Sequence, residues 1–312
     1  MRFTVLASGS GGNASLVESD GFGVLIDVGL GPRQLAARLT AAGLSWSAVR
    51  AVLLTHTHSD HWKDTTLTYL HRHKIPLYCH ANHHTVLCTY SDGFLALQKA
   101  DLVRSFESHQ ELVLSPNLRC RALPVRHDGG ATFGFRLEGS ADLFGRRGAI
   151  GYVADLGSWD EELASHLADV DVLAVEFNHD VAMQHASGRA PRLIARVLGD
   201  EGHLSNAQAV ELVRAVLERS TAGRLRHLVQ LHLSRECNRP AIAREAARAL
   251  LEELGVTLTL HTAEQHAAGT TLHLNADSRR GRSRRAPARR SARSSSAHPL
   301  LPGLDDRPVT QD

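Results

Sequence analysis

The segment 52-VLLTHTHSDHW-62 places three histidines and an aspartate within six residues, directly after an apolar run. Side chains two positions apart in an extended segment share a face, so His56, His58 and Asp60 point to one side. His61 follows Asp60 at the turn into a helix, where these two side chains can serve a second ion. Imidazole and carboxylate ligands suit Zn²⁺, Mn²⁺ or Fe²⁺, and a segment without thiolate argues against a purely structural zinc site. The segment therefore predicts metal binding at a strand end.

Two other histidine-rich stretches carry less information. With 20 histidines in 312 residues, pairs at a spacing of two arise by chance. We interpret HRH at 71–73 and HANHH at 80–84 as surface positions without a ligand role.

The elements that position these ligands lie within residues 1–275, where short β-type runs alternate with helix-type segments. Short apolar runs between turn residues predict strands at 3–7, 14–19, 23–28, 51–55, 119–125, 132–138, 149–155, 171–177, 227–233 and 256–260. One-sided apolar patterns with capping residues or first-turn prolines predict helices at 31–43, 205–219 and 240–254. This order predicts sheets covered by helices, in a layered α/β or α+β domain.

Length and composition permit a folded enzyme. The chain has 312 residues, of which 43% are hydrophobic, so it can bury a substantial core. Its four cysteines form no CxxC pair, which favours reduced thiols over a disulfide framework. The N-terminus shows no signal-peptide pattern, and no apolar run approaches the roughly 18 residues that indicate a membrane span. We expect a cytoplasmic protein without membrane association; its oligomeric state is left open.

The C-terminal tail, 276–312, differs in composition from the rest. Nine arginines and four aspartates give it a net charge of +5, so the remainder carries −3 of the overall +2. The tail is rich in Arg, Ser, Ala and Pro and poor in large apolar residues, which predicts disorder. Two interpretations stay open: binding of nucleic-acid phosphates through counterion release, or a solvated tail that aids solubility.

The segment His56 to His61 resembles the HxHxDH signature of the metallo-β-lactamase superfamily. The resemblance covers about residues 1–275 and implies an α+β fold, a layered αββα sandwich with two divalent ions, Zn²⁺ or Mn²⁺, at one sheet edge. It assigns His56, His58 and His127 to one ion, Asp60, His61 and His232 to the other, and Asp155 as the bridge. Asp27 in LIDVG resembles the early aspartate of the family, which would orient a ligand histidine.

Such a centre implies hydrolysis. Paired divalent ions lower the pKa of a bound water, so that hydroxide is available at neutral pH, and they hold the attacking and leaving oxygens in line. Asp60, between the ions, could orient that hydroxide as well as bind metal.

Further features favour phosphodiester substrates. The assigned ligands include no cysteine, unlike those of zinc lactamases with a Cys ligand. Glu176, His203 and His232 resemble the Glu, His and His of phosphodiesterase members such as tRNase Z, where the Glu–His pair supports proton delivery to the leaving oxygen. The loop ASGSGGNAS at 7–15 is either a tight hairpin near the site or a phosphate cradle.

Spacing narrows the resemblance to a compact subgroup. Only 28 positions separate His127 from Asp155 and 77 separate Asp155 from His232, which excludes long inserted arms or domains. The motifs LASGSGGN, LIDVG, LTHTHSDH, GYVADLG, EFNHD, GHLSN and HLSRECN resemble the WalJ/YycJ-like subgroup, which implies a metal-dependent exonuclease that digests double-stranded DNA from 5′ to 3′.

Other functions stay open at this point. The same centre could hydrolyse a small ester, thioester or cyclic phosphate, and a silent metal-binding scaffold is a third interpretation. The run 178–180 in EFNHD has no derived role, and capping near the site is as good an interpretation as substrate contact.

Overall fold

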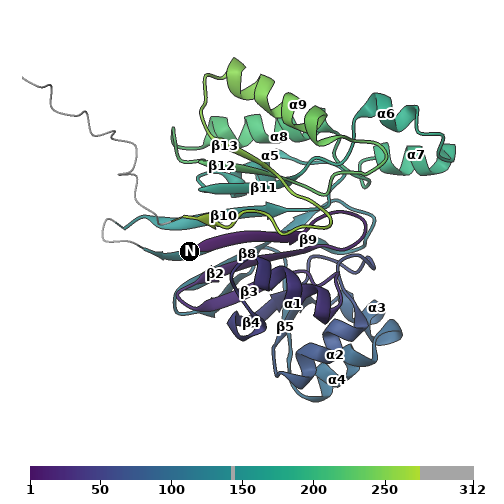
Figure 1. Ribbon diagram of the computed structural model, residues 1–312, viewed down its shortest axis with the longest axis vertical. Helices are drawn as coiled ribbons and strands as arrows, with labels where there is room; N and C mark the ends of the chain where they lie inside the picture. The colour runs from purple at the N-terminus through teal and green to yellow at the C-terminus, as the bar shows by residue number, and fades with distance from the viewer. Residues whose placement is uncertain (142–144, 275–312) are drawn as a thin grey trace, which may run out of the picture. The chain divides into compact units, whose positions relative to one another are not determined.

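The computed structural model describes residues 1–141 and 145–274 (Figure 1), so the predicted boundary at 275 and the tail 276–312 lie outside the described residues. Within the described part, two seven-stranded mixed sheets make up the β-structure. The first runs in the order β14 (Leu272–His273), β1 (Arg2–Ala7), β2 (Ala14–Ser19), β3 (Phe22–Ile26), β4 (Val49–Leu53), β5 (Leu77–His80) and β6 (Val103–Phe106). The second runs β13 (Thr259–Thr262), β12 (His227–Leu231), β11 (Val172–Glu176), β10 (Arg147–Val153), β9 (Thr132–Ala141), β8 (Leu118–Val125) and β7 (Glu111–Ser115).

The two sheets pack face to face around one apolar core. Strand β11 illustrates why: its buried residues alternate, with Val172 and Ala174 in the core between the sheets and Leu173 and Val175 in the core beneath helices. A strand buried on both faces reads as a continuous apolar run, which is how the sequence predicted it.

Helices cover the outer face of each sheet (Figure 1). The first sheet is covered by α1 (Pro32–Ala41), α2 (Asp64–Arg72), α3 (His83–Tyr90) and α4 (Asp92–Lys99), and the second by α5 (Glu161–Leu167), α8 (Asn206–Arg219) and α9 (Pro240–Glu253). Two short helices, α6 (Val181–His185) and α7 (Pro191–Leu198), precede α8. This order confirms the predicted αββα sandwich. None of the described helices is long and apolar enough to cross a membrane.

The structure adds elements that the sequence patterns did not indicate. Strands β5, β6, β7 and β14 were not predicted, nor were α3, α4, α5, α6 and α7. Edge strand β6 reads VRSF, and its Arg104 and Ser105 face solvent, so it lacks an apolar run. The missed helices have five to eight residues, too short for a clear apolar periodicity.

The interpretation of HANHH as surface positions was wrong for two of its histidines. His80 and His83 are buried, in contact with the ring of Phe133. His83 donates a hydrogen bond from Nε2 to the carbonyl of Ala131 at 2.7 Å, and its Nδ1 accepts one from the backbone of His80 at 3.3 Å. Acceptance at Nδ1 needs the neutral ring, and burial lowers the pKa of His83 to about 4.

Acidification is therefore expected to destabilise the fold through His83. Between pH 6.5 and 4 the unfolded chain binds a proton at this histidine and the folded chain does not, so the free energy of unfolding falls as pH falls. From pH 7 to pH 5 this contribution is about 2 kcal/mol. Urea unfolding of His83→Gln should show a weaker pH dependence than wild type, while the matched variant His71→Gln keeps it. An unchanged pH dependence in His83→Gln would contradict the assignment.

Candidate metal centre

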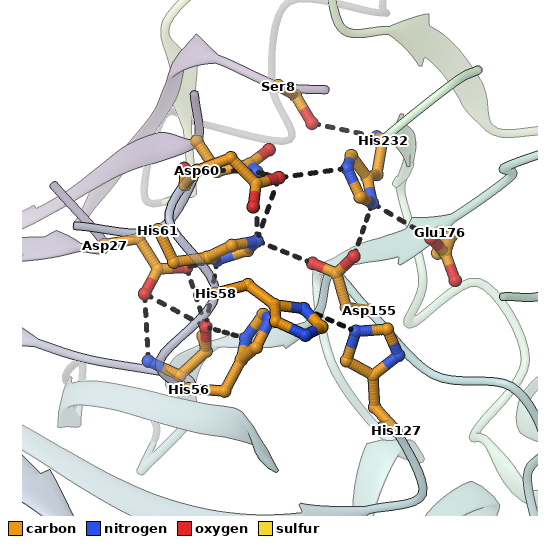
Figure 2. A network of polar contacts seen from close by, with 12 residues as sticks. Ser8, Asp27, His56, His58, Asp60, His61, His127, Asp155, Glu176 and His232 are labelled. Atoms are coloured by element: carbon orange, nitrogen blue, oxygen red, sulfur yellow. Dashed lines mark hydrogen bonds and ion pairs between the residues drawn. The ribbon is translucent and has the colours of Figure 1, made fainter. Parts of the chain in front are cut away.

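The predicted ligands converge at one edge of the sandwich (Figure 2). They follow the carboxyl ends of strands: four after β4, one after β8, one after β10 and one after β12. Because β3 and β4 are parallel, as are β10, β11 and β12, their carboxyl ends meet at the same edge. Segments far apart in the sequence thus deliver polar side chains to one place.

His56, His58 and His127 form the first group. One ring nitrogen from each lies within 4.8 Å of the other two, and Nε2 of His127 is 3.2 Å from Nδ1 of His58. His127 donates from Nδ1 to the carbonyl of Gly202 at 2.8 Å, which leaves its Nε2 lone pair facing the site. Nε2 of His56 is buried without a hydrogen-bond partner among the described residues.

Asp60, His61, Asp155 and His232 form the second group. Nε2 of His61 lies 3.0 Å from Asp155 Oδ2, and Nδ1 of His232 lies 2.5 Å from Asp155 Oδ1, so Asp155 stands between the two rings. Oδ2 of Asp60 is 3.6 Å from Nε2 of both histidines. Nε2 of His232 is also buried and has no hydrogen-bond partner among the described residues.

Asp27 orients His61 as the resemblance implied. Its Oδ2 accepts a hydrogen bond from Nδ1 of His61 at 2.7 Å, and Oδ1 accepts from the backbone of Thr55 at 2.9 Å. The carboxylate is completely buried, and Asp27 has φ of +63°, a left-handed conformation that is rare for residues other than glycine. Fixing Nδ1 as the donor directs Nε2 toward the site.

The pKa values divide the imidazoles into two kinds. Burial is the largest cause that lowers the pKa of His56, His58 and His127, and neighbouring histidines lower it further. These three rings are neutral near pH 7 and offer lone pairs. Burial alone would lower the pKa of His61, but Asp27 and Asp155 raise it to about 10. Metal binding at His61 must therefore displace a proton.

Glu176 and His203 complete the arrangement at the end of β11. Oε1 of Glu176 is 2.8 Å from Nδ1 of His203 and 3.0 Å from Nδ1 of His232. Its Oε2 accepts hydrogen bonds from the backbone of Leu156 and Leu204. Burial alone would lower the pKa of His203, but the Glu176 carboxylate raises it above its usual value, which favours the protonated ring.

These residues fit divalent metal ions. Neutral imidazoles, two carboxylates at the centre and buried ring nitrogens without partners are what Zn²⁺ or Mn²⁺ sites require. The structure brings together the seven ligand candidates that the sequence indicated and places the predicted Glu176–His203 pair beside them.

Several residues near the centre escaped the sequence interpretation. Asn13, at the end of the Gly/Ser loop, has Nδ2 3.0 Å from Nε2 of His61 and 3.2 Å from Oδ2 of Asp60. Asp128 has Oδ1 3.7 Å from Nε2 of both His58 and His127. Asn13 lies in the motif LASGSGGN and Asp128 directly follows His127, but only their contacts in the structure indicate a role.

The Gly/Ser loop favours the hairpin interpretation over the phosphate cradle. Backbone N–H groups of Gly9, Gly11, Gly12 and Asn13 already donate to acceptors within the protein. Gly29 packs this loop against the metal-binding segment, since a Cβ there would lie 1.7 Å from the carbonyl oxygen of Asp60. The loop therefore supports the ligands and has few donors left for an anion.

The αββα sandwich with this edge site defines a class of protein, and comparison with known proteins agrees. Residues 23–223 match the beta-lactamase superfamily domain, so the chain belongs to the beta-lactamase superfamily. The predicted hydrolase class is thereby confirmed.

Particular relatives share most of the chain. Exodeoxyribonuclease WalJ from Streptococcus pneumoniae is 27% identical over 237 residues, 76% of this chain and 83% of the relative. Exodeoxyribonuclease YycJ from Bacillus anthracis is 28% identical over 263 residues, 82% of this chain and 90% of the relative. The structure of Zn²⁺-bound PqqB from Methylobacterium extorquens superposes with a TM-score of 0.61 at 19% identity, covering 88% and 100% of the two chains. The last likeness concerns the fold alone.

Proposed function

We propose that the protein is a metal-dependent phosphodiesterase that acts as a DNA exonuclease, with 5′→3′ digestion of double-stranded DNA as the activity to test first. The pairing of Glu176 with His203 next to the clustered ligands carries this proposal. A phosphodiester has a poor leaving oxygen, and this pair offers a proton to it. Similarity to two exodeoxyribonucleases supports a polynucleotide substrate.

The proposed metal centre holds two divalent ions, Zn²⁺ or Mn²⁺. The ligand set is His56, His58 and His127 for one ion, Asp60, His61 and His232 for the other, and Asp155 between them. Bound there, the ions would supply an activated water and neutralise charge on the phosphate oxygens.

The side chains have separate tasks in this proposal. Asp60 orients the attacking water through Oδ2, which faces both His61 and His232. His203 donates the proton to the leaving oxygen from Nε2, because Nδ1 is held by Glu176. Glu176 is a positioning residue: it fixes the tautomer of His203 and raises the pKa of the ring, which favours the protonated form.

Digestion of end-labelled DNA tests the function. Purified protein is incubated with double- and single-stranded DNA and Mn²⁺, Mg²⁺ or Zn²⁺, with Asp60→Asn as the control for contaminating nuclease. Stepwise loss of nucleotides from one end by wild type alone is expected, and EDTA should stop it. Turnover of bis(p-nitrophenyl) phosphate without any cleavage of DNA would replace the proposal with the alternative, a small-molecule ester, thioester or cyclic phosphate hydrolase. Retained metal without hydrolysis of any ester would indicate a scaffold.

A further inference from the structure

A cleft of about 410 Å³ opens beside the candidate centre. It shares His203 and His232 with that centre, so the two are continuous. Its walls come from Ser10 after β1, from α7 with the residue Arg189 before it, and from the segment 233–236 after β12. Because His203 is the proposed proton donor, the cleft lies on the side of the leaving group.

The walls combine one exchangeable cation with apolar surface. Arg189 forms an ion pair with Glu236, with both Nε and Nη2 2.9 Å from Oε2. The Arg189 side chain is 23% exposed and that of Glu236 is 70% exposed, so Glu236 can turn into solvent while Arg189 stays in the cleft. Leu193 and Leu233 add apolar surface.

The second arginine that lines the cleft, Arg196, already has a carboxylate partner. Arg196 binds both carboxylate oxygens of Asp128, one of them from Nη2 at 2.8 Å. Asp128 in turn lies against His58 and His127. Arg196 therefore ties α7 to the metal centre, and Arg189 is the arginine whose partner can leave.

We propose that this cleft binds the nucleotide on the leaving-group side of the scissile bond, with Arg189 exchanging Glu236 for the phosphate of that nucleotide. The inference rests on the proposed function and assigns it a substrate subsite. The planar guanidinium presents two N–H groups that match phosphate oxygens. An exposed ion pair contributes little to stability, so its exchange is easy. The volume lies within the roughly 300–1,000 Å³ of small-ligand sites, and the leucines suit a sugar or base.

Kinetics with two substrates test the subsite. Arg189→Gln should raise KM for an oligonucleotide about tenfold or more, the effect of losing a charged hydrogen-bonded contact. The loss on bis(p-nitrophenyl) phosphate should be much smaller, because that substrate has no second phosphate. Glu236→Gln should lower KM for the oligonucleotide, since it frees Arg189. The matched control is Arg192→Gln, which removes a charge three residues further along the chain, in α7, but not from the cleft wall.

A binding measurement distinguishes a failure of the proposed subsite from a failure of the proposed function. Fluorescence anisotropy of a labelled oligonucleotide is compared between Asp60→Asn and the double variant with Arg189→Gln, where no cleavage intervenes. A weaker complex with a salt slope reduced by about one is expected. Equal affinity, or equal losses for Arg189→Gln and Arg192→Gln, would overturn the subsite even if DNA is digested. Absence of DNA cleavage by wild type would overturn the proposed function alone.

Discussion

Replacing Asp60 by asparagine is expected to reduce phosphodiester hydrolysis on the order of 10³-fold, the upper range for removing one electrostatic contact at a reacting centre. Oδ2 of Asp60 lies 3.6 Å from Nε2 of both His61 and His232, so this oxygen stands between the two halves of the ligand set. Asparagine keeps the shape of the side chain but removes the charge that, in the proposed centre, would hold a divalent ion and orient water. The Asp60 side chain is 20% exposed, so replacing its carboxylate by an amide adds little buried polar surface. We therefore expect the fold to persist.

Three measurements test the prediction for Asp60→Asn: turnover of bis(p-nitrophenyl) phosphate, metal content by mass spectrometry and the melting temperature. The matched control is Asp128→Asn, which also removes a carboxylate near the histidines but one already bound by Arg196. Its loss of rate should be clearly smaller. If Asp60→Asn retained a tenth of the wild-type rate with unchanged metal content, Asp60 would have to leave the ligand set.

The layers of the fold were predictable because local chemistry and global packing agree. Strand β11 is apolar on both faces, since one face meets the other sheet and the other meets helices. Helix α8 begins with Ser205 and Gln208 in a capping box, as the sequence indicated. The sequence did not predict edge strand β6. Its Arg104 and Ser105 are exposed, so no buried face requires a regular alternation of apolar and polar residues.

The predicted strand ends were wrong in an informative way. The sequence extended three strands through Thr55, Asp155 and Leu233, but β4 ends at Leu53, β10 at Val153 and β12 at Leu231. Each of these strands ends two residues earlier than its run of apolar residues predicts. The ligand candidates Asp155 and His232 lie in these stretches, and His56 directly follows Thr55, because a side chain on a regular strand would point into a core.

The ligand candidates were easier to predict from the sequence than the residues that contact and support them. The ligand candidates from His56 to His61 lie within six positions, whereas Asn13 contacts His61 across 48 positions and Asp128 contacts His58 across 70. Arg196 reaches Asp128 from 68 positions away. Such contacts depend on how loops approach one another at the sheet edge, which no local pattern encodes.

Replacing His203 by alanine is expected to slow DNA cleavage by roughly 10²- to 10⁴-fold, the usual contribution of a positioned general acid. A nucleoside oxygen leaves as a strongly basic alkoxide unless a proton arrives, and His203, held through Nδ1 by Glu176, is the proposed donor of that proton. p-Nitrophenolate is stable without that proton, so hydrolysis of bis(p-nitrophenyl) phosphate should fall far less.

The ratio of the two losses separates proton donation from metal binding. His127→Ala provides the contrast: His127 lies in the first ligand group, 3.2 Å from His58, and its removal should slow both substrates alike. Rates for His203→Ala and His127→Ala are therefore measured on end-labelled DNA and on the aryl ester at saturating metal. A selective loss on DNA in His203→Ala supports the acid role, because only the leaving-group oxygen differs in its need for a proton. Equal losses on both substrates would instead place His203 among the groups that hold the metal centre together.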